Sequence, residues 1–239
     1  MNTRIHILDE LRGFCVVLMV IYHALYTLAA SFMIPFALRM YAFFYPVEPF
    51  FAGIFIALCG FSCRLSRHNL RRGLLLGAVA MGMTAVLLAV MPSQIIWFGV
   101  LHCLSVCILL FTAAKPLLDR IPPLVGVIAS AVLFALTWTM PTLQGGRFLW
   151  WTLPEALLGC DALLPLGFGT LFSADYFSLI PWVFCFLFGT FLGRWHDRLP
   201  AWCYTSRVKP LAWLGRHSLP VYLAHQPIIY GLAWVFTYI

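Results

Sequence analysis

The chain has 239 residues, of which 63% are hydrophobic and only 10% are charged, and its mean hydropathy is +0.94. Ordinary globular proteins carry about 25% charged residues, so this composition excludes a soluble domain and indicates a polytopic membrane protein. The net charge of +7 does not indicate a nucleic-acid partner, because the basic residues cluster beside apolar runs.

The apolar runs predict an all-α transmembrane bundle that forms one domain over residues 1–239. Several runs reach the length that a helix needs to cross a lipid bilayer. The first run is too long for a signal peptide and no cleavage site follows it, so we expect it to remain as an anchor. We expect about seven spans, at residues 10–33, 43–63, 73–91, 95–114, 122–140, 176–193 and 217–237.

The distribution of basic residues predicts the orientation of these spans. If the arginine-rich loop between the second and third spans is cytoplasmic, thirteen of the fifteen Lys and Arg residues lie inside and only Arg39 and Arg147 lie outside. Such a bias is typical of cytoplasmic loops. We therefore expect a cytoplasmic N-terminus, an external C-terminus and insertion in a bacterial inner membrane.

Residues 141–174 are apolar enough to suggest a further crossing, but Pro154, Glu155, Asp161 and Pro165 interrupt the run. We interpret the segment as an external re-entrant or interfacial loop, with Trp150 and Trp151 near the membrane surface. It is a candidate lid over a cavity, and an amphipathic loop without that role is the alternative.

The first span carries the main candidate site. Arg12 and His23 are eleven residues apart, which places them on nearly the same face of a helix, about 16 Å apart along its axis. An ionisable residue at that depth is costly and suggests a function, although a histidine that only hydrogen-bonds between helices is the alternative. Asp9 can pair with Arg12, and such an arginine can bind a phosphate. Both charges could instead simply anchor the end of the span.

Other polar residues lie within or beside later spans. His102 is predicted at a depth similar to that of His23, which suggests one shared polar centre with a histidine as general base. His225 and Gln226 lie one to two turns into the last span. Asp175 and Glu48 are candidate substrate contacts near the outer surface, although Ser173 and Asp175 could instead cap the sixth span.

No metal site is predicted. The histidines lack metal-binding spacings, and most of the eight cysteines lie in apolar runs, as small buried hydrophobic residues do. Hydrolase elbows and phosphate-binding loops are also missing from the sequence.

Five stretches, in order, resemble the heparan-α-glucosaminide N-acetyltransferase catalytic-domain family. They are the D-x-L-R-G element with its histidine eleven residues after the arginine, PFFAGIFIALCGFSCRLSR, WFGVLHCLSV, SADYFSLIPWVFCFLFGTFLG and SLPVYLAHQP. The first element also resembles the wider membrane acyltransferase superfamily.

The resemblance implies transfer of an acetyl group from acetyl-CoA to an amino sugar or another glycan-type acceptor. It implies that His23 is the base or a transient acyl carrier, with His102 and Asp9 completing the catalytic set. We further expect Arg12, His225 and Gln226 to contact the donor and Asp175 and Glu48 to contact the acceptor.

Two other functions stay open at this point. A transporter could use the same histidines as a proton relay, although it would favour internal repeats that the sequence lacks. A structural membrane subunit would not need histidines in mid-membrane. The oligomeric state, with a homodimer as one option, is also left open.

Overall fold

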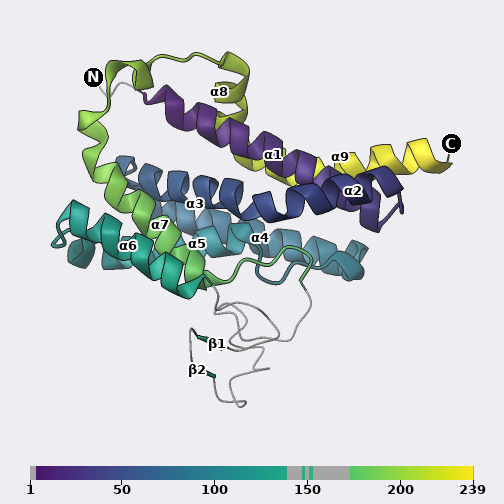
Figure 1. The fold of residues 1–239 in the computed structure, drawn as a ribbon, viewed down its shortest axis with the longest axis horizontal. Helices are drawn as coiled ribbons and strands as arrows, with labels where there is room; N and C mark the ends of the chain where they lie inside the picture. The colour runs from purple at the N-terminus through teal and green to yellow at the C-terminus, as the bar shows by residue number, and fades with distance from the viewer. Residues whose placement is uncertain (1–3, 139–146, 149–150, 153–172, 239) are drawn as a thin grey trace. The chain divides into compact units, whose positions relative to one another are not determined.

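The computed structural model describes residues 4–138, 147–148, 151–152 and 173–238. Within these residues the protein is all-α except for one short hairpin (Figure 1). The helices are α1 (His6–Ala30), α2 (Pro35–Phe44), α3 (Glu48–Leu65), α4 (Asn69–Val90), α5 (Val100–Leu118), α6 (Pro123–Thr137), α7 (Leu179–Leu192), α8 (Lys209–Arg216) and α9 (Ser218–Tyr238). Short 3₁₀ turns occur at η1 (Tyr45–Val47), η2 (Pro92–Gln94), η4 (Gly193–Arg198) and η5 (Ala201–Tyr204).

Each of the seven predicted spans corresponds to a helix of the structure, namely α1, α3, α4, α5, α6, α7 and α9. Among the residues that the structure describes, four segments are long and apolar enough to cross a membrane, and α6 is a shorter apolar helix. Those four segments are His6–Ala30, Pro35–Leu65, Asn69–Val90 and Val100–Leu118. The count of seven crossings and the orientation stay predictions.

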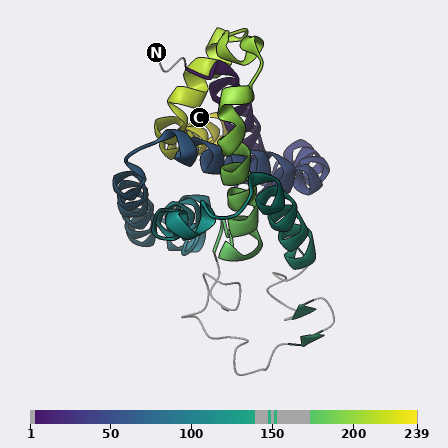
Figure 2. The same ribbon diagram turned by 90° about the vertical axis from the view of Figure 1, so that its left-hand side faces the viewer.

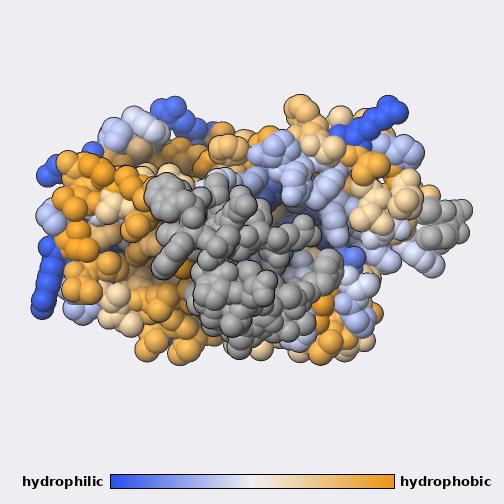
Figure 3. Space-filling view, turned by 60° about the horizontal axis from the view of Figure 1, so that its bottom comes forward, coloured by the Kyte–Doolittle hydropathy of each residue, from blue (hydrophilic) through white to orange (hydrophobic). Residues whose placement is uncertain are grey.

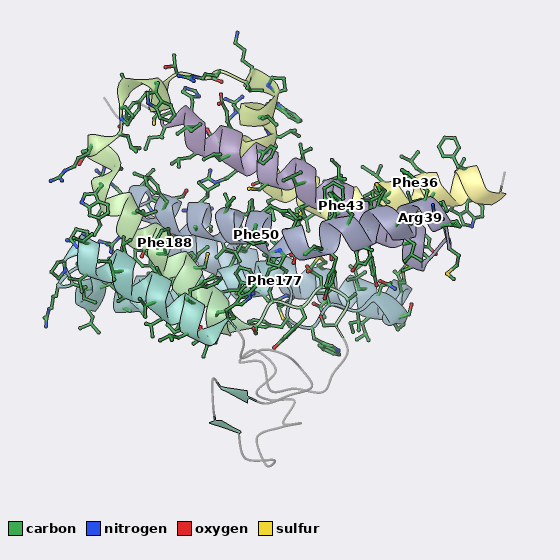
Figure 4. All side chains as sticks on the ribbon, viewed as in Figure 1. Phe36, Arg39, Phe43, Phe50, Phe177 and Phe188 are labelled. Atoms are coloured by element: carbon green, nitrogen blue, oxygen red, sulfur yellow. The ribbon has the colours of Figure 1, made fainter. Side chains whose placement is uncertain are left out.

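Large apolar side chains are exposed along several helices, as lipid-facing surfaces require. Phe36, Phe43 and Phe50, labelled in Figure 4, are 68%, 68% and 72% exposed on α2 and α3. Apolar residues also cover much of the surface seen in Figure 3. This exposure agrees with the membrane character that the composition indicates.

The chain divides into two compact units, which are described separately. The first comprises Met1–Leu58 with Arg198–Ile239, and the second comprises Cys59–Asp197. The prediction of a single domain stays a prediction.

In the first unit, α1 packs against α2, α8 and α9. Glycines allow α8 to approach α1 closely: a Cβ added at Gly13 would collide with the carbonyl of Leu211, and one at Gly215 with the carbonyl of Asp9. Because the position later in α8 meets the position earlier in α1, the two helices are antiparallel. This contact brings residues near 210 beside the start of the chain.

In the second unit, α4 packs against α5 and α6 packs against α7 (Figures 1 and 2). Phe111 of α5 and Phe186 of α7 are almost completely buried and their rings meet edge to face, 6.3 Å apart. The guanidinium of Arg64 lies 5.0 Å from the centre of the Phe111 ring and hydrogen-bonds Asp119 and the Thr190 carbonyl. Arg64 therefore links the ends of α3, α5 and α7.

The predicted external loop at 141–174 lies mostly outside the described residues. Within it, β1 (Arg147–Phe148) and β2 (Trp151–Thr152) pair antiparallel, with Phe148 opposite Trp151. The proposed lid and its interfacial position stay predictions.

Candidate active site

A pair of histidines occupies the middle of the first unit. Nδ1 of His23 on α1 lies 2.8 Å from Nε2 of His225 on α9, and the two rings stack with centroids 4.9 Å apart. His225 is buried and His23 is half-buried. Two imidazoles in direct contact can share a hydrogen, because each ring has one nitrogen that donates and one that accepts in its neutral form. The fold thus brings together two histidines that are 202 positions apart in the sequence.

A second hydrogen bond joins the same two helices next to this pair. The hydroxyl of Thr27 donates to Oε1 of Gln226 over 3.1 Å, and Thr27 lies one turn after His23 on α1. Residues four apart on a helix lie on one face. Consecutive residues of α9 therefore contact consecutive turns of α1, and the two bonds fix the register of the helices.

Tyrosines of α1 and α2 border the histidine pair. The ring of Tyr22 lies 5.8 Å from that of His23, and its hydroxyl lies 3.2 Å from the hydroxyl of Tyr41. Glu48, the first residue of α3, interacts electrostatically with both phenols. The structure thus places Glu48 in the same unit as His23, beside a cluster of phenols.

The start of α1 carries the predicted charge cluster. Asp9 is 4% exposed and accepts hydrogen bonds from Arg4 at 2.6 Å and from Arg12 at 3.3 Å. One carboxylate thus binds two guanidinium groups at the start of α1. The predicted pairing of Asp9 with Arg12 is confirmed.

Glu10 has a role that the sequence analysis missed. Its Oε1 accepts hydrogen bonds from the Ser206 hydroxyl at 3.0 Å and from the backbone N–H groups of Arg207 and Val208 at 2.6 and 2.9 Å. These donors precede α8, so a carboxylate on α1 binds the N-terminal end of α8. Through Glu10 and Gly13, the D-E-L-R-G element thus forms a surface on which α8 packs. The proline in the first turn of α8 is a sequence signal for that helix.

His102 lies in the second unit. It is 7% exposed near the start of α5, and its Nε2 lies 3.4 Å from the hydroxyl of Thr84 on α4. That hydroxyl lies 2.5 Å from the Ile96 carbonyl, to which it donates. His102 thus helps to attach α4 to the connection that precedes α5. Nδ1 of His102 has no hydrogen-bond partner among the described residues.

Asp175 lies close to His102 and interacts with it electrostatically. Its segment runs beside the α4–α5 connection, because Ala174 N–H donates to the Ile95 carbonyl and Phe177 N–H to the Phe98 carbonyl, both at 2.9 Å. The alternative in which Ser173 and Asp175 cap the sixth span is wrong, because α7 begins only at Leu179. The hydroxyl of Ser173 instead accepts a hydrogen bond from Trp97 N–H.

The structure therefore groups the predicted site residues in two sets. His23, His225, Gln226, Glu48, Asp9 and Arg12 belong to the first unit, and His102 and Asp175 belong to the second. The prediction that His23 and His102 share one polar centre stays a prediction. Within the described ranges, no three His, Cys, Asp or Glu side chains converge on a position that could hold a metal ion.

The comparisons with known proteins gave one match. A family model described as heparan-alpha-glucosaminide N-acetyltransferase, catalytic, matches residues 4–227. No curated protein and no solved structure matched the chain. The family match extends over both units and includes every site residue named above. The chain belongs to the heparan-α-glucosaminide N-acetyltransferase catalytic family, a family of membrane acetyltransferase domains.

Proposed function

We propose that the protein transfers an acetyl group from acetyl-CoA to an amino sugar or another glycan-type acceptor, with His23 as the reacting histidine. The observation that carries this proposal is the His23–His225 pair at 2.8 Å inside apolar helices of an acetyltransferase-family chain. A purely structural histidine needs only one polar partner of any kind. A second imidazole as that partner favours proton chemistry.

As a general base, His23 takes the proton of the acceptor amine or hydroxyl while a new C–N or C–O bond forms at the acetyl carbon. The C–S bond of the thioester breaks, and the proton then passes from His23 to the CoA thiolate. As an acyl carrier, His23 would instead attack the acetyl carbon itself, and the C–S bond would break to release the CoA thiolate. The acceptor amine or hydroxyl would then attack the acetyl-histidine, the bond from the acetyl carbon to His23 would break, and the proton of the acceptor would pass to the thiolate.

The charge cluster at the start of α1 fits the anionic part of the donor. Arg4 and Arg12, both bound to Asp9, offer guanidinium groups of the kind that bind the phosphates of CoA. The Arg12 side chain is 21% exposed and thus accessible. Contacts of His225 and Gln226 with the donor, and of Asp175 and Glu48 with the acceptor, remain expectations from the sequence.

The test uses protein in liposomes with [¹⁴C]acetyl-CoA, with and without glucosamine. We expect labelled glucosamine from wild type, and a loss of about 100- to 10,000-fold in His23→Ala and His23→Gln. His68→Ala, which changes an exposed histidine outside the site, is the matched control and should keep full activity. All variants are first compared with wild type by size-exclusion elution and melting temperature.

The outcomes separate the alternatives. Label retained on wild type without acceptor, and lost in His23→Gln, would support the acyl carrier over the base. Equal transfer by wild type and both His23 variants would move the chemistry to another residue. Absence of both donor binding and transfer in wild type would overturn the acetyl-CoA assignment, and solute flux would then test the transporter.

A further inference from the structure

Both ring nitrogens of His225 are engaged. Its Nδ1 hydrogen-bonds the backbone carbonyl of Tyr222, one turn earlier on α9, and its Nε2 faces Nδ1 of His23 at 2.8 Å. A carbonyl oxygen can only accept a hydrogen bond. Nδ1 of His225 must therefore carry a hydrogen.

The hydrogen on Nδ1 of His225 determines which nitrogen donates in the hydrogen bond between the two histidines. A neutral imidazole has one N–H and one lone pair, so a hydrogen on Nδ1 of His225 leaves a lone pair on its Nε2. That lone pair can only accept, so Nδ1 of His23 must carry the hydrogen that is donated. Nε2 of His23 is then the nitrogen with the free lone pair. The opposite tautomer of His23 would place two lone pairs against each other at 2.8 Å.

We propose that His225 is a positioning residue that holds His23 in its Nδ1–H tautomer and thereby presents the Nε2 lone pair of His23 to the reacting group. Donation thus runs from Nδ1–H of His23 to Nε2 of His225, and from Nδ1–H of His225 to the Tyr222 carbonyl. The effect of His225 on catalysis rests on the proposed function of His23. The assignment of the tautomer does not depend on that function.

The contact geometry favours this role over a direct contact of His225 with the donor. His225 is 6% exposed, and its two nitrogens already have partners on α9 and α1. The stacked rings, inclined by 24°, also hold the imidazole plane of His23. The neighbouring bond from Thr27 to Gln226 joins α1 to α9 without touching either histidine, so it offers a matched control for simple loss of helix contact.

The experiment combines ¹⁵N spectroscopy of histidine-labelled protein in liposomes with steady-state kinetics. The imidazole signals of His23 are assigned by their loss in His23→Ala. We expect wild-type His23 to show a protonated Nδ1 and an unprotonated Nε2. His225→Phe keeps a buried ring but removes the acceptor, so His23 should shift toward the Nε2–H tautomer.

We expect kcat to change with the tautomer of His23. We expect His225→Phe to lower kcat about 10- to 100-fold, the range typical of a partner that orients a functional histidine, with the KM for acetyl-CoA nearly unchanged. His225→Gln offers a side-chain oxygen near the former Nε2 and should restore both the Nδ1–H signal and most of kcat. Thr27→Val should leave the tautomer unchanged and kcat within about twofold.

Two results would overturn the inference. One is an Nε2–H signal for His23 in active wild-type protein. The other is an equal loss of kcat in His225→Phe and Thr27→Val with an unchanged His23 signal, which would indicate helix packing alone. Wild-type protein that shows the Nδ1–H signal but transfers no acetyl group would support the pairing and count against the proposed function. The wild-type signal is assigned with His23→Ala and does not depend on His225→Phe, so a misfolded His225→Phe would not prevent the test.

Discussion

His23 and His102 lie in different units and have different surroundings. Nδ1 of His23 meets a second imidazole, whereas Nε2 of His102 meets the hydroxyl of Thr84, which in turn binds a backbone carbonyl. The first arrangement joins two titratable groups by a direct hydrogen bond. The hydrogen bond of His102 instead joins α4 to the start of α5, and its titratable neighbour, Asp175, interacts with it electrostatically. We infer from this difference that His23 carries the chemistry and that the main role of His102 is to stabilise the second unit.

The sharpest test of this comparison changes both histidines to the same residue. We expect His23→Gln to lower acetyl transfer at saturating acetyl-CoA by about 100- to 10,000-fold, because the proton acceptor is lost. His102→Gln should retain transfer within about tenfold but lower the melting temperature, because its bond to Thr84 is weakened. If His102→Gln lost as much transfer at an unchanged melting temperature, the two histidines would share the chemistry.

A glycine substitution tests the scaffold of the first unit. Gly13→Ala should destabilise the protein by about 1–3 kcal/mol, because the new methyl group collides with the backbone of α8 rather than with a movable side chain. Thermal unfolding in detergent, followed by tryptophan fluorescence, measures the effect.

The matched control is Gly82→Ala on α4, where a Cβ meets nothing within 4 Å. That change should be neutral or stabilise by about 0.5–1 kcal/mol, because alanine favours a helix. Equal melting temperatures for the two variants would mean that α8 does not pack closely on α1.

The second unit is tested through the partner of His102. Thr84→Val keeps the side-chain shape but removes the donor to the Ile96 carbonyl, so we expect a loss of about 1–3 kcal/mol in stability. Thr112→Val removes only a bond to the carbonyl of Ile108 in its own helix and should change stability by less than about 0.5 kcal/mol. A loss of transfer in Thr84→Val at wild-type stability would contradict the structural role of this pair.

The smallest expected effect is a pH dependence in the second unit. Burial acts to raise the pKa of Asp119, but its hydrogen bond from Arg64 and the charges of Arg64 and Lys115 outweigh it, so the pKa is lowered. Its stabilising contribution is therefore present above the pKa of the unfolded state and is lost as pH falls through the folded pKa. We expect the melting temperature of wild type to fall more than that of Asp119→Asn between about pH 5 and pH 3. If the melting temperatures of the two proteins fell in parallel with pH, the ion pair of Arg64 with Asp119 would contribute nothing to stability.

Much of the helical pattern could be predicted, because spans of apolar residues have a required length and each predicted span has a matching helix. The short helices α2 and α8 were missed, since neither is long enough to resemble a span. Asp9 with Arg12 could be predicted because a helix brings i and i+3 together. The pairing of His23 with His225 could not, because it depends on how α9 packs against α1.

The role of Glu10 was out of reach for the same reason. Its partners lie near residue 207, and only the folded first unit brings them to the start of α1. Sequence spacing identifies groups on one helix, whereas packing decides which helices meet.

The most direct test of the central claim is CoA release from acetyl-CoA by liposomes that contain wild type or His23→Gln, with glucosamine present in both. We expect acceptor-dependent thiol release by wild type and at least a 100-fold slower release by the folded variant. Release at the same rate from both proteins would contradict the assignment of the chemistry to His23.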